Sequence, residues 1–505
     1  MVGCGGNDSG SGASSSSTEP ASLAAPGSVV FAEGNLRPTG ELKANADAVA
    51  KTLAGASSLR DFVVSELESA AQSEGEPVDF VTEVEPWLGK VAGVAFGRFE
   101  DEELSEPLIA IQTTKATATQ AFIDKQAGRS KEPSKSGSYK GIDFKIGGSE
   151  GDAIGLVGEW LVLADDEKEF KAAVDAYNGD SLADEGRFQD AIAAATNGSL
   201  ADVYVDVGKL IEQSGGDTGS QAQEFLQSSG IDPSEATALA SVIPGAEQIE
   251  VDLSSNLGGE KAPSGDASEL LGSVPASSFA AFAASGFGEQ LEEAVDNLDE
   301  SGVPPDLQPN ELKDALSQAG VDVDKLAASL EEAVVFAEGS SRESLGGALV
   351  VTSKSSEAAE AVATLGTLLR GASVPGVAAV SGQASGFSIR SPELGGTPVV
   401  VVAKGTRIAI GYGLPQALRG LNAGSGPTLA DSSSYKAAVS SLGKTPISAY
   451  VDGPAALRLA EALVPRSKKD FWEAAPYLKK IAYLALGGNS GAEPATATLI
   501  AGLSK

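Results

Sequence analysis

The sequence predicts an α+β protein with two homologous tandem domains, each a largely antiparallel sheet with helices packed on it. Short β-branched or alternating runs recur along the chain, and turns or single helices separate them without regular βαβ alternation. One series of strand and helix motifs occurs twice in the same order, which indicates a tandem duplication. The composition is 42% hydrophobic but only 5% aromatic, so it predicts cores rich in Ala, Val and Leu.

The expected elements appear as ordered pairs, one member in each copy. The early strands correspond at residues 26–31 and 275–280, 94–96 and 334–336, and 107–111 and 347–351. The later pairs are 160–165 and 407–412, 181–188 and 428–435, and 201–206 and 447–452. The first two of these later pairs are offset by 247 residues and the third by 246, which indicates a one-residue deletion. An ordered series of this kind favours duplication over chance.

Composition shifts give the expected domain boundaries. Residues 1–25 form a truncated lipobox and a Gly/Ser-rich linker with few large apolar groups, and residues 258–266 form a second, shorter linker. The first α+β repeat then covers residues 26–257 and the second covers residues 267–505. Within the first repeat, Asp232-Pro233-Ser234-Glu235 predicts the start of a helix with Asp232 at the N-cap.

Three motifs resemble a known family. They are the early strand of proline, small residues and an aromatic, the turn Leu-Ala-Asp followed four residues later by Phe188 or Tyr435, and the strand end Tyr-Val-Asp. The pattern is similar to bacterial envelope proteins grouped as domain of unknown function 3352, and it covers most of residues 26–505. None of these motifs is catalytic, so the resemblance implies a fold and a cell-envelope location but no mechanism.

Cys4, the only cysteine, follows small residues and precedes the Ser-rich linker, as in a bacterial lipobox. A diacylglycerol on its thiol would supply the two chains that stable anchoring requires, and the expected location is the extracytoplasmic face of the cell membrane. A lipoprotein signal also needs a basic and an apolar segment before the cysteine, whereas only three residues precede Cys4. Either the start lies upstream or the chain has been trimmed; the alternative is a cytosolic protein with a chance cysteine.

Charge excludes some classes of partner. The net charge of −34 argues against nucleic acid, whose phosphates need a cationic surface. Residues 345–505 carry 15 basic and 9 acidic residues, whereas the rest of the chain carries 21 and 61. This asymmetry is consistent with docking of the two halves on each other or of the C-terminal part on an anionic envelope surface. The alternative is that it reflects only solubility and neutral drift of surface charge. No apolar stretch reaches the roughly 20 residues of a membrane-spanning helix.

Residue types exclude most catalytic chemistry. The chain has no histidine, so Ser-His-Asp, Cys-His and HExxH sites are absent, and no phosphate-binding Gly-rich motif occurs. We therefore expect no cofactor and no metal; the acidic runs 101–103 and 165–167 lack EF-hand spacing. The repeated aspartates at strand–helix junctions are expected to be helix caps, namely Asp184, Asp206, Asp431 and Asp452. A paired-carboxylate site would need two of them in one cleft.

One basic and aromatic cluster is a candidate contact with membrane headgroups or acidic envelope polymer. It consists of Arg466, Lys468, Lys469, Trp472, Lys479 and Lys480, interleaved with Phe471 and Tyr477. The alternative is a solvated helix face that covers the core. Trp160 begins a strand whose second copy has Arg407, so packing at a sheet edge is expected for it.

These observations favour a non-enzymatic, lipid-anchored cell-envelope protein that binds a partner protein, an envelope polymer or an apolar ligand. An apolar ligand is attractive because a curved sheet with Ala and Val walls can form a cup. The alternative is a carboxylate-dependent hydrolase with a site between the two domains. The type of ligand and the existence of a cavity stay open at the level of sequence.

Overall fold

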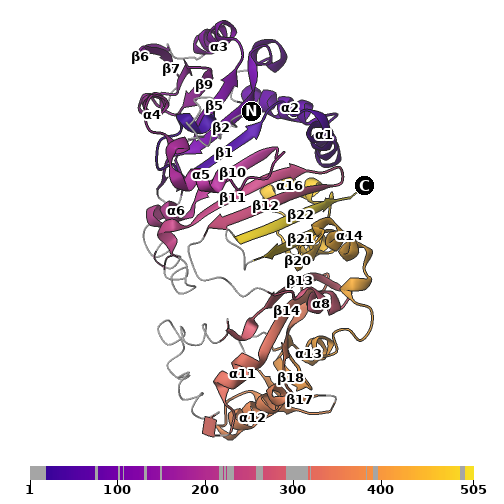
Figure 1. Cartoon of the computed structure of the whole chain (residues 1–505). Helices are drawn as coiled ribbons and strands as arrows, with labels where there is room; N and C mark the ends of the chain where they lie inside the picture. The colour runs from indigo at the N-terminus through magenta and orange to yellow at the C-terminus, as the bar shows by residue number, and fades with distance from the viewer. Residues whose placement is uncertain are drawn as a thin grey trace, which may run out of the picture. The chain divides into compact units, whose positions relative to one another are not determined.

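A computed structural model of the chain has an α+β fold, as the sequence predicts (Figure 1). It forms two compact units: unit 1 comprises Met1–Asp47, Ala56–Ile243 and Ser254–Gly259, and unit 2 comprises Ala48–Gly55, Pro244–Leu253 and Glu260–Lys505. The structure describes residues 19–73, 78–100, 103–105, 107–129, 134–147, 151–214, 220, 223, 232–256, 265–289, 291, 317–318, 320–382, 384–390, 396–489 and 495–504. Cys4, the acidic pair 101–102 and most of the linker 258–266 lie outside these residues.

Unit 1 contains an antiparallel sheet in the order β11-β10-β1-β2-β5-β9-β8-β7-β6. Its strands are β1 (Val30–Asn35), β2 (Leu88–Phe96), β5 (Leu108–Thr113), β6 (Lys135–Tyr139), β7 (Ile142–Ile146), β8 (Ala153–Val157), β9 (Trp160–Ala164), β10 (Ala201–Asp206) and β11 (Thr237–Pro244). A separate hairpin pairs β3 (Phe99–Glu100) with β4 (Glu103–Leu104).

The helical elements of the first part of the chain are mostly short. The α-helices are α1 (Gly40–Ala54), α2 (Leu59–Ser73), α3 (Ala116–Arg129), α4 (Glu167–Tyr177), α5 (Gly186–Ile192) and α6 (Val207–Ser214). Single turns are η1 (Pro20–Leu23), η2 (Phe80–Val84), η3 (Leu182–Asp184) and η4 (Pro233–Glu235). The prediction that the linker extends to residue 25 is wrong for its last residues, because the side chains of η1 and Ala24 are buried in the core of unit 1. Asp232 caps η4, as predicted, but the helix that follows it is only one 3-10 turn.

Unit 2 contains an antiparallel sheet in the order β22-β21-β20-β13-β14-β15-β19-β18-β17-β16, with β12 paired to β22. Its strands are β12 (Gln248–Asn256), β13 (Ser278–Ser285), β14 (Leu330–Glu338), β15 (Gly346–Ser353), β16 (Val377–Val380), β17 (Ser385–Ile389), β18 (Val399–Lys404), β19 (Arg407–Tyr412), β20 (Ile447–Asp452), β21 (Ile481–Asn489) and β22 (Ala495–Leu503).

Helices of unit 2 pack on both ends of its sheet. They are α8 (Ser268–Ser273), α11 (Val323–Ser329), α12 (Glu357–Gly371), α13 (Leu414–Leu421), η6 (Leu429–Asp431), α14 (Ser433–Leu442), α15 (Gly453–Leu463) and α16 (Lys469–Leu478). Figure 1 shows α14 beside β20 and β21. Residues of α14, of these two strands and of α8 share one hydrophobic core. At the other end of the sheet, α12 and α13 pack on strands β18 and β19.

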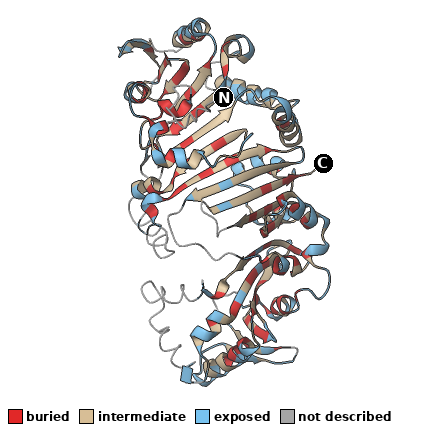
Figure 2. Ribbon diagram, viewed as in Figure 1, coloured by how far each residue is buried: buried red, intermediate tan, exposed pale blue. Residues whose placement is uncertain are grey.

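Buried and less buried positions alternate along the strands, as period-two side-chain geometry requires (Figure 2). In unit 1 the ring of Phe188 stands edge-to-face against Phe31 at 5.5 Å and Tyr204 at 5.1 Å. In unit 2 Tyr435 and Tyr450 make a similar contact at 5.2 Å. Burial raises the pKa of Tyr435 to about 12, so both tyrosines pack as neutral aromatic side chains.

The expectation for Trp160 is wrong. Its side chain is fully buried, because β9 lies between β5 and β8 in the interior of the sheet. The sequence comparison with Arg407 was misleading for a local reason. Arg407 is only half-buried and donates to the carbonyl of Ala423, so its surroundings differ from those of Trp160.

An ion-pair cluster joins η2 to α3 in unit 1. The carboxylate of Glu83 lies 2.7 Å from Arg129 Nη2 and 2.9 Å from Lys125 Nζ. The main-chain oxygen of Glu83 also accepts the indole N–H of the buried Trp87 at 2.6 Å. The hydrogen bond from Arg129, followed by the one from Lys125, lowers the pKa of Glu83 from its ordinary 4.5 to about 2.

This cluster predicts a pH dependence of stability. A carboxyl group with a depressed folded-state pKa stabilises the fold fully above pH 4.5, and the contribution is lost as the pH falls toward about 2. Because Lys125 is largely exposed, screening limits the contribution to about 1–2 kcal/mol. In denaturant unfolding followed by fluorescence, Glu83→Gln should lower the free energy of unfolding at pH 7, and the loss should be smaller at pH 3.

The matched control is Glu41→Gln, which alters an exposed glutamate at the start of α1. We expect its free energy of unfolding to follow the wild type at both pH values. An equal loss for Glu83→Gln at pH 7 and pH 3 would show that the substitution acts through packing and not through the ion pairs.

Candidate functional site

An apolar row crosses the sheet of unit 2 on the face opposite the α8–α14 core. Pairing registers place one residue from each of seven strands in line: Leu499, Leu486, Ala449, Phe282, Val335, Leu349 and Ile410. Directly opposed residues of antiparallel strands project from the same face. The side chains at the centre are the least covered, since Phe282 is 50% and Val335 is 47% exposed.

A second apolar row lies two residues along the same strands. It consists of Ala501, Leu484, Val451, Ala280, Ala337 and Gly347, which the registers again place opposite one another. From β22 to β15 the rows cross five strand spacings of about 4.8 Å, so they extend for about 24 Å. We call these two rows, with Phe282 at their centre, the open face of unit 2. Within the rows Phe282 and Val335 are exposed, whereas Leu349 packs against the buried residues Leu330, Ala333 and Val351. Adjacent exposed apolar side chains of this kind often mark a binding surface.

Unit 1 has an apolar row of smaller side chains on one face of its sheet, and at one end of this row Leu163 packs against the buried residues Trp87, Ile123 and Leu161. Its registers align Ala240, Val203, Ala32, Val94, Ile109 and Leu163, all half-buried. The neighbouring row contains Ala238, Val205, Val30 and Phe96. In this row Ala32 lies opposite Val94, whereas in unit 2 Phe282 lies opposite Val335.

These residues were missed in the sequence, although a signal was present. The strand Ser278–Ser285 is apolar on both alternating positions, as is Leu330–Glu338 over its central residues. Such strands are typical of sheets covered on both faces. In unit 2 only one of the two faces at Phe282 and Val335 is covered, which the sequence alone does not reveal.

The structure places Arg466, Phe471 and Trp472 in contact at the start of α16, whereas Lys479 and Lys480 follow the end of this helix. The guanidinium of Arg466 lies 3.6 Å from the centre of the Trp472 ring, and Phe471 stands edge-to-face to the same ring at 5.1 Å. Lys479 forms an ion pair of 3.2 Å with Glu461. The remaining cations Lys468, Lys469 and Lys480 are exposed. We call Arg466, Lys468, Lys469, Trp472, Lys479 and Lys480 the basic surface.

The aspartates at the strand–helix junctions accept hydrogen bonds from nearby residues. Asp452 caps α15 by accepting the N–H of Ala455 at 2.8 Å. Asp206 accepts the N–H of Lys209 at 2.9 Å and is also bound by Arg187 at 2.9 Å. Both capping predictions are confirmed, and Asp166 in the run 165–167 likewise caps α4.

Asp184 and Asp431 differ from the expectation. They are the third residues of the turns η3 and η6, and each carboxylate bonds back to the N–H and hydroxyl of Ser181 or Thr428. This is a capping box that closes the turn rather than an N-cap of the following helix. The backbone N–H of Thr428 lowers the pKa of Asp431, so the carboxylate stays ionised.

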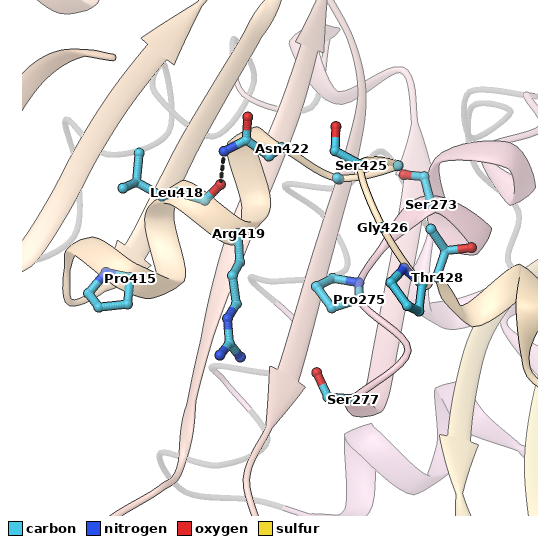
Figure 3. A pocket seen from close by; sticks show the side chains of 13 residues that line it. Ser273, Pro275, Ser277, Pro415, Leu418, Arg419, Asn422, Ser425, Gly426 and Thr428 are labelled. Atoms are coloured by element: carbon cyan, nitrogen blue, oxygen red, sulfur yellow. Dashed lines mark hydrogen bonds between the residues drawn. The ribbon is translucent and has the colours of Figure 1, made fainter. Parts of the chain in front are cut away.

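Two shallow depressions adjoin in unit 2 beside α13. The first, of about 390 Å³, lies between α13 and the loop 422–428; the second, of about 400 Å³, includes Glu338, Gln416 and Arg458. Ser277 and Arg419 line both. Figure 3 shows Arg419 extending from α13 toward Ser277, while Asn422 donates to the carbonyl of Leu418.

No group of three or more His, Cys, Asp or Glu side chains suited to a metal ion occurs within the described ranges. Among the same residues, no helix combines the length and the apolar character needed to cross a bilayer.

The family model for proteins of unknown function named DUF3352 matches residues 54–488. The chain therefore belongs to the DUF3352 family, as its motifs suggested. No curated protein matches its sequence. Two crystal structures of TP0453 are similar over part of the chain. Crystal form I is 13% identical over 49% of this chain and 82% of its own, with a TM-score of 0.28; crystal form III is 12% identical over 48% and 82%, with a TM-score of 0.27.

Proposed function

We propose that the protein is a non-enzymatic, lipid-anchored cell-envelope protein whose open face in unit 2 binds an apolar ligand. The observation that carries this proposal is the exposed pair Phe282 and Val335 at the centre of the two apolar rows. Covering one large apolar side chain is worth about 1.5–3 kcal/mol, so several adjacent positions supply useful affinity without any catalytic group. A length of about 24 Å suits a long acyl chain lying across the strands.

Cys4 and the basic surface support a location at the membrane. A diacylglycerol on Cys4 would hold the chain at the extracytoplasmic face of the cell membrane, with residues 5–18, which precede the buried turn η1, as a tether. Arg466 stacked on Trp472, with three exposed lysines nearby, has the cationic and amphipathic character that suits phospholipid headgroups. In this proposal the basic surface contacts anionic headgroups, and the open face of unit 2 takes up the apolar part of a ligand.

We also infer that the two units descend from one duplicated ancestor. The pairing orders support this: β1 lies between β10 and β2 in unit 1, as β13 lies between β20 and β14 in unit 2. Outward from there, β5-β9-β8-β7-β6 follows the same plan as β15-β19-β18-β17-β16.

A charge on the open face of unit 2 should abolish binding of an apolar ligand. We expect Phe282→Asp and Val335→Asp each to weaken binding of a fluorescent long-chain fatty acid by at least about tenfold, because the ligand would have to desolvate the new carboxylate. Titration of the probe's fluorescence measures the affinity, and circular dichroism checks the fold.

Leu67→Asp is the matched control, since Leu67 is 51% exposed on α2. It should leave the affinity for the fatty acid unchanged. Equal affinities for all three variants and the wild type would remove the proposal. If Phe282→Asp instead abolished a concentration-dependent dimer without altering the fatty acid titration, the open face would belong to a contact between copies.

Lipid attachment at Cys4 predicts a modified N-terminal peptide. In membranes of cells that produce the natural protein, mass spectrometry should find the peptide beginning at Cys4 with added diacylglycerol. Cys4→Ser should move the protein from the membrane fraction to the released fraction. Recovery of an unmodified peptide containing Met1 from the cytosol would contradict both the anchor and the location.

Charge reversal tests the basic surface. In a Cys4→Ser background, changing Lys468, Lys469, Lys479 and Lys480 to Glu should lower co-sedimentation with anionic phospholipid vesicles by more than about tenfold, since each lysine near the surface contributes about 1 kcal/mol. The control reverses four other exposed lysines of unit 2, which are Lys354, Lys404, Lys436 and Lys444. Loss of cell-wall binding with intact vesicle binding would assign the surface to an acidic polymer instead.

A further inference from the structure

Glu338 is a buried charge at the end of β14, and its surroundings are built to hold it. Its side chain is only 4% exposed, it forms an ion pair with Arg419, and it accepts the hydroxyl of Ser277 at 2.6 Å. A buried carboxylate needs such partners because removing a charged group from water is unfavourable in free energy. Glu338 therefore fixes the position of Arg419, which lies across both depressions of unit 2.

The guanidinium groups of Arg419 and Arg458, which line the second depression, have N–H donors left over for a ligand. The side chain of Arg419 remains 54% exposed after pairing with Glu338. Arg458 of α15 is exposed, lines the second depression, and has no ion-pair or hydrogen-bond partner within the described part of the chain. Two guanidinium groups and one carboxylate leave one net positive charge. Guanidinium groups bind phosphate oxygens with paired N–H donors.

An unused acceptor lies in the same depression. The side-chain oxygen of Gln416 is buried and accepts no hydrogen bond from the described residues. An anion alone cannot satisfy it, because an oxyanion has no proton to donate, whereas a ligand hydroxyl can. The loop that lines the adjoining depression contains Gly424 and Gly426, whose positive φ angles of 86° and 132° favour glycine.

We propose that unit 2 binds a polyol phosphate in the depression lined by Arg419, Arg458 and Gln416. The phosphate lies against the two guanidinium groups, and a ligand hydroxyl donates to the side-chain oxygen of Gln416. Ser277 stays bonded to Glu338 and keeps Arg419 in place. The site is separate from the open face, so phosphate binding does not depend on Phe282. The same group occurs in free polyol phosphates and in glycerophospholipid headgroups.

The first test is calorimetric titration of the full chain with sn-glycerol 3-phosphate and with inorganic phosphate. Glycerol phosphate should bind more tightly, and Arg458→Gln should weaken it by at least about tenfold. Gln416→Met should reduce the affinity for glycerol phosphate to that for inorganic phosphate. Arg390→Gln, a change at another exposed arginine of unit 2, should have no effect. Arg419 is left intact because its loss would strand the buried Glu338.

The second test separates the two sources of the ligand. Vesicles of phosphatidylglycerol are titrated with wild type and Arg458→Gln, in competition with soluble glycerol 3-phosphate. Competition together with weaker binding of the variant assigns the site to a lipid headgroup; binding of the soluble compound alone assigns it to a free polyol phosphate. The proposal is overturned if neither ligand binds, if inorganic phosphate binds as tightly, or if Arg458→Gln and Arg390→Gln behave alike. Phe282→Asp should retain phosphate binding, which distinguishes this site from the open face.

Discussion

The register of β13 between β20 and β14 determines both faces of unit 2. Ala281 lies opposite Tyr450 and Phe336, on the side that α8 and α14 cover. The next residue, Phe282, lies opposite Ala449 and Val335 on the open side. Because side chains alternate with a period of two, a shift by one residue would exchange the core with the exposed surface. The packed core therefore holds the open face in place, and one cannot form without the other.

The buried ion pair of unit 2 lies at the end of β14, one of the strands that form the open face. Glu338 closes β14 just beyond Val335, and its pairing with Arg419 ties the end of this strand to α13. Apolar and charged surfaces thus occur on one rigid framework, which suits a ligand with an acyl chain or a phosphate. The apolar row of unit 1 has the small residue Ala32 opposite Val94, and all of its residues are half-buried.

Much of the fold could be predicted from local pattern. The alternating strands, the junction caps at Asp206 and Asp452 and the family motifs all depend on residues close together in sequence. Trp160 was misplaced because its burial depends on which strands lie beside β9, and those strands are distant in sequence. The sequence predicted helix starts at Asp184 and Asp431. It did not predict that each carboxylate accepts hydrogen bonds from the residue three positions earlier in the chain.

By itself the sequence determined the α+β class, the family and the absence of histidine chemistry, since these need only residue types and short-range spacing. It also singled out the basic residues around Trp472, which lie within one short segment. Only the tertiary structure decided that Phe282 and Val335 are exposed together and that Glu338 meets Arg419, 81 residues away. Their proximity arises from strand pairing and helix packing across long loops, and no local pattern encodes those contacts.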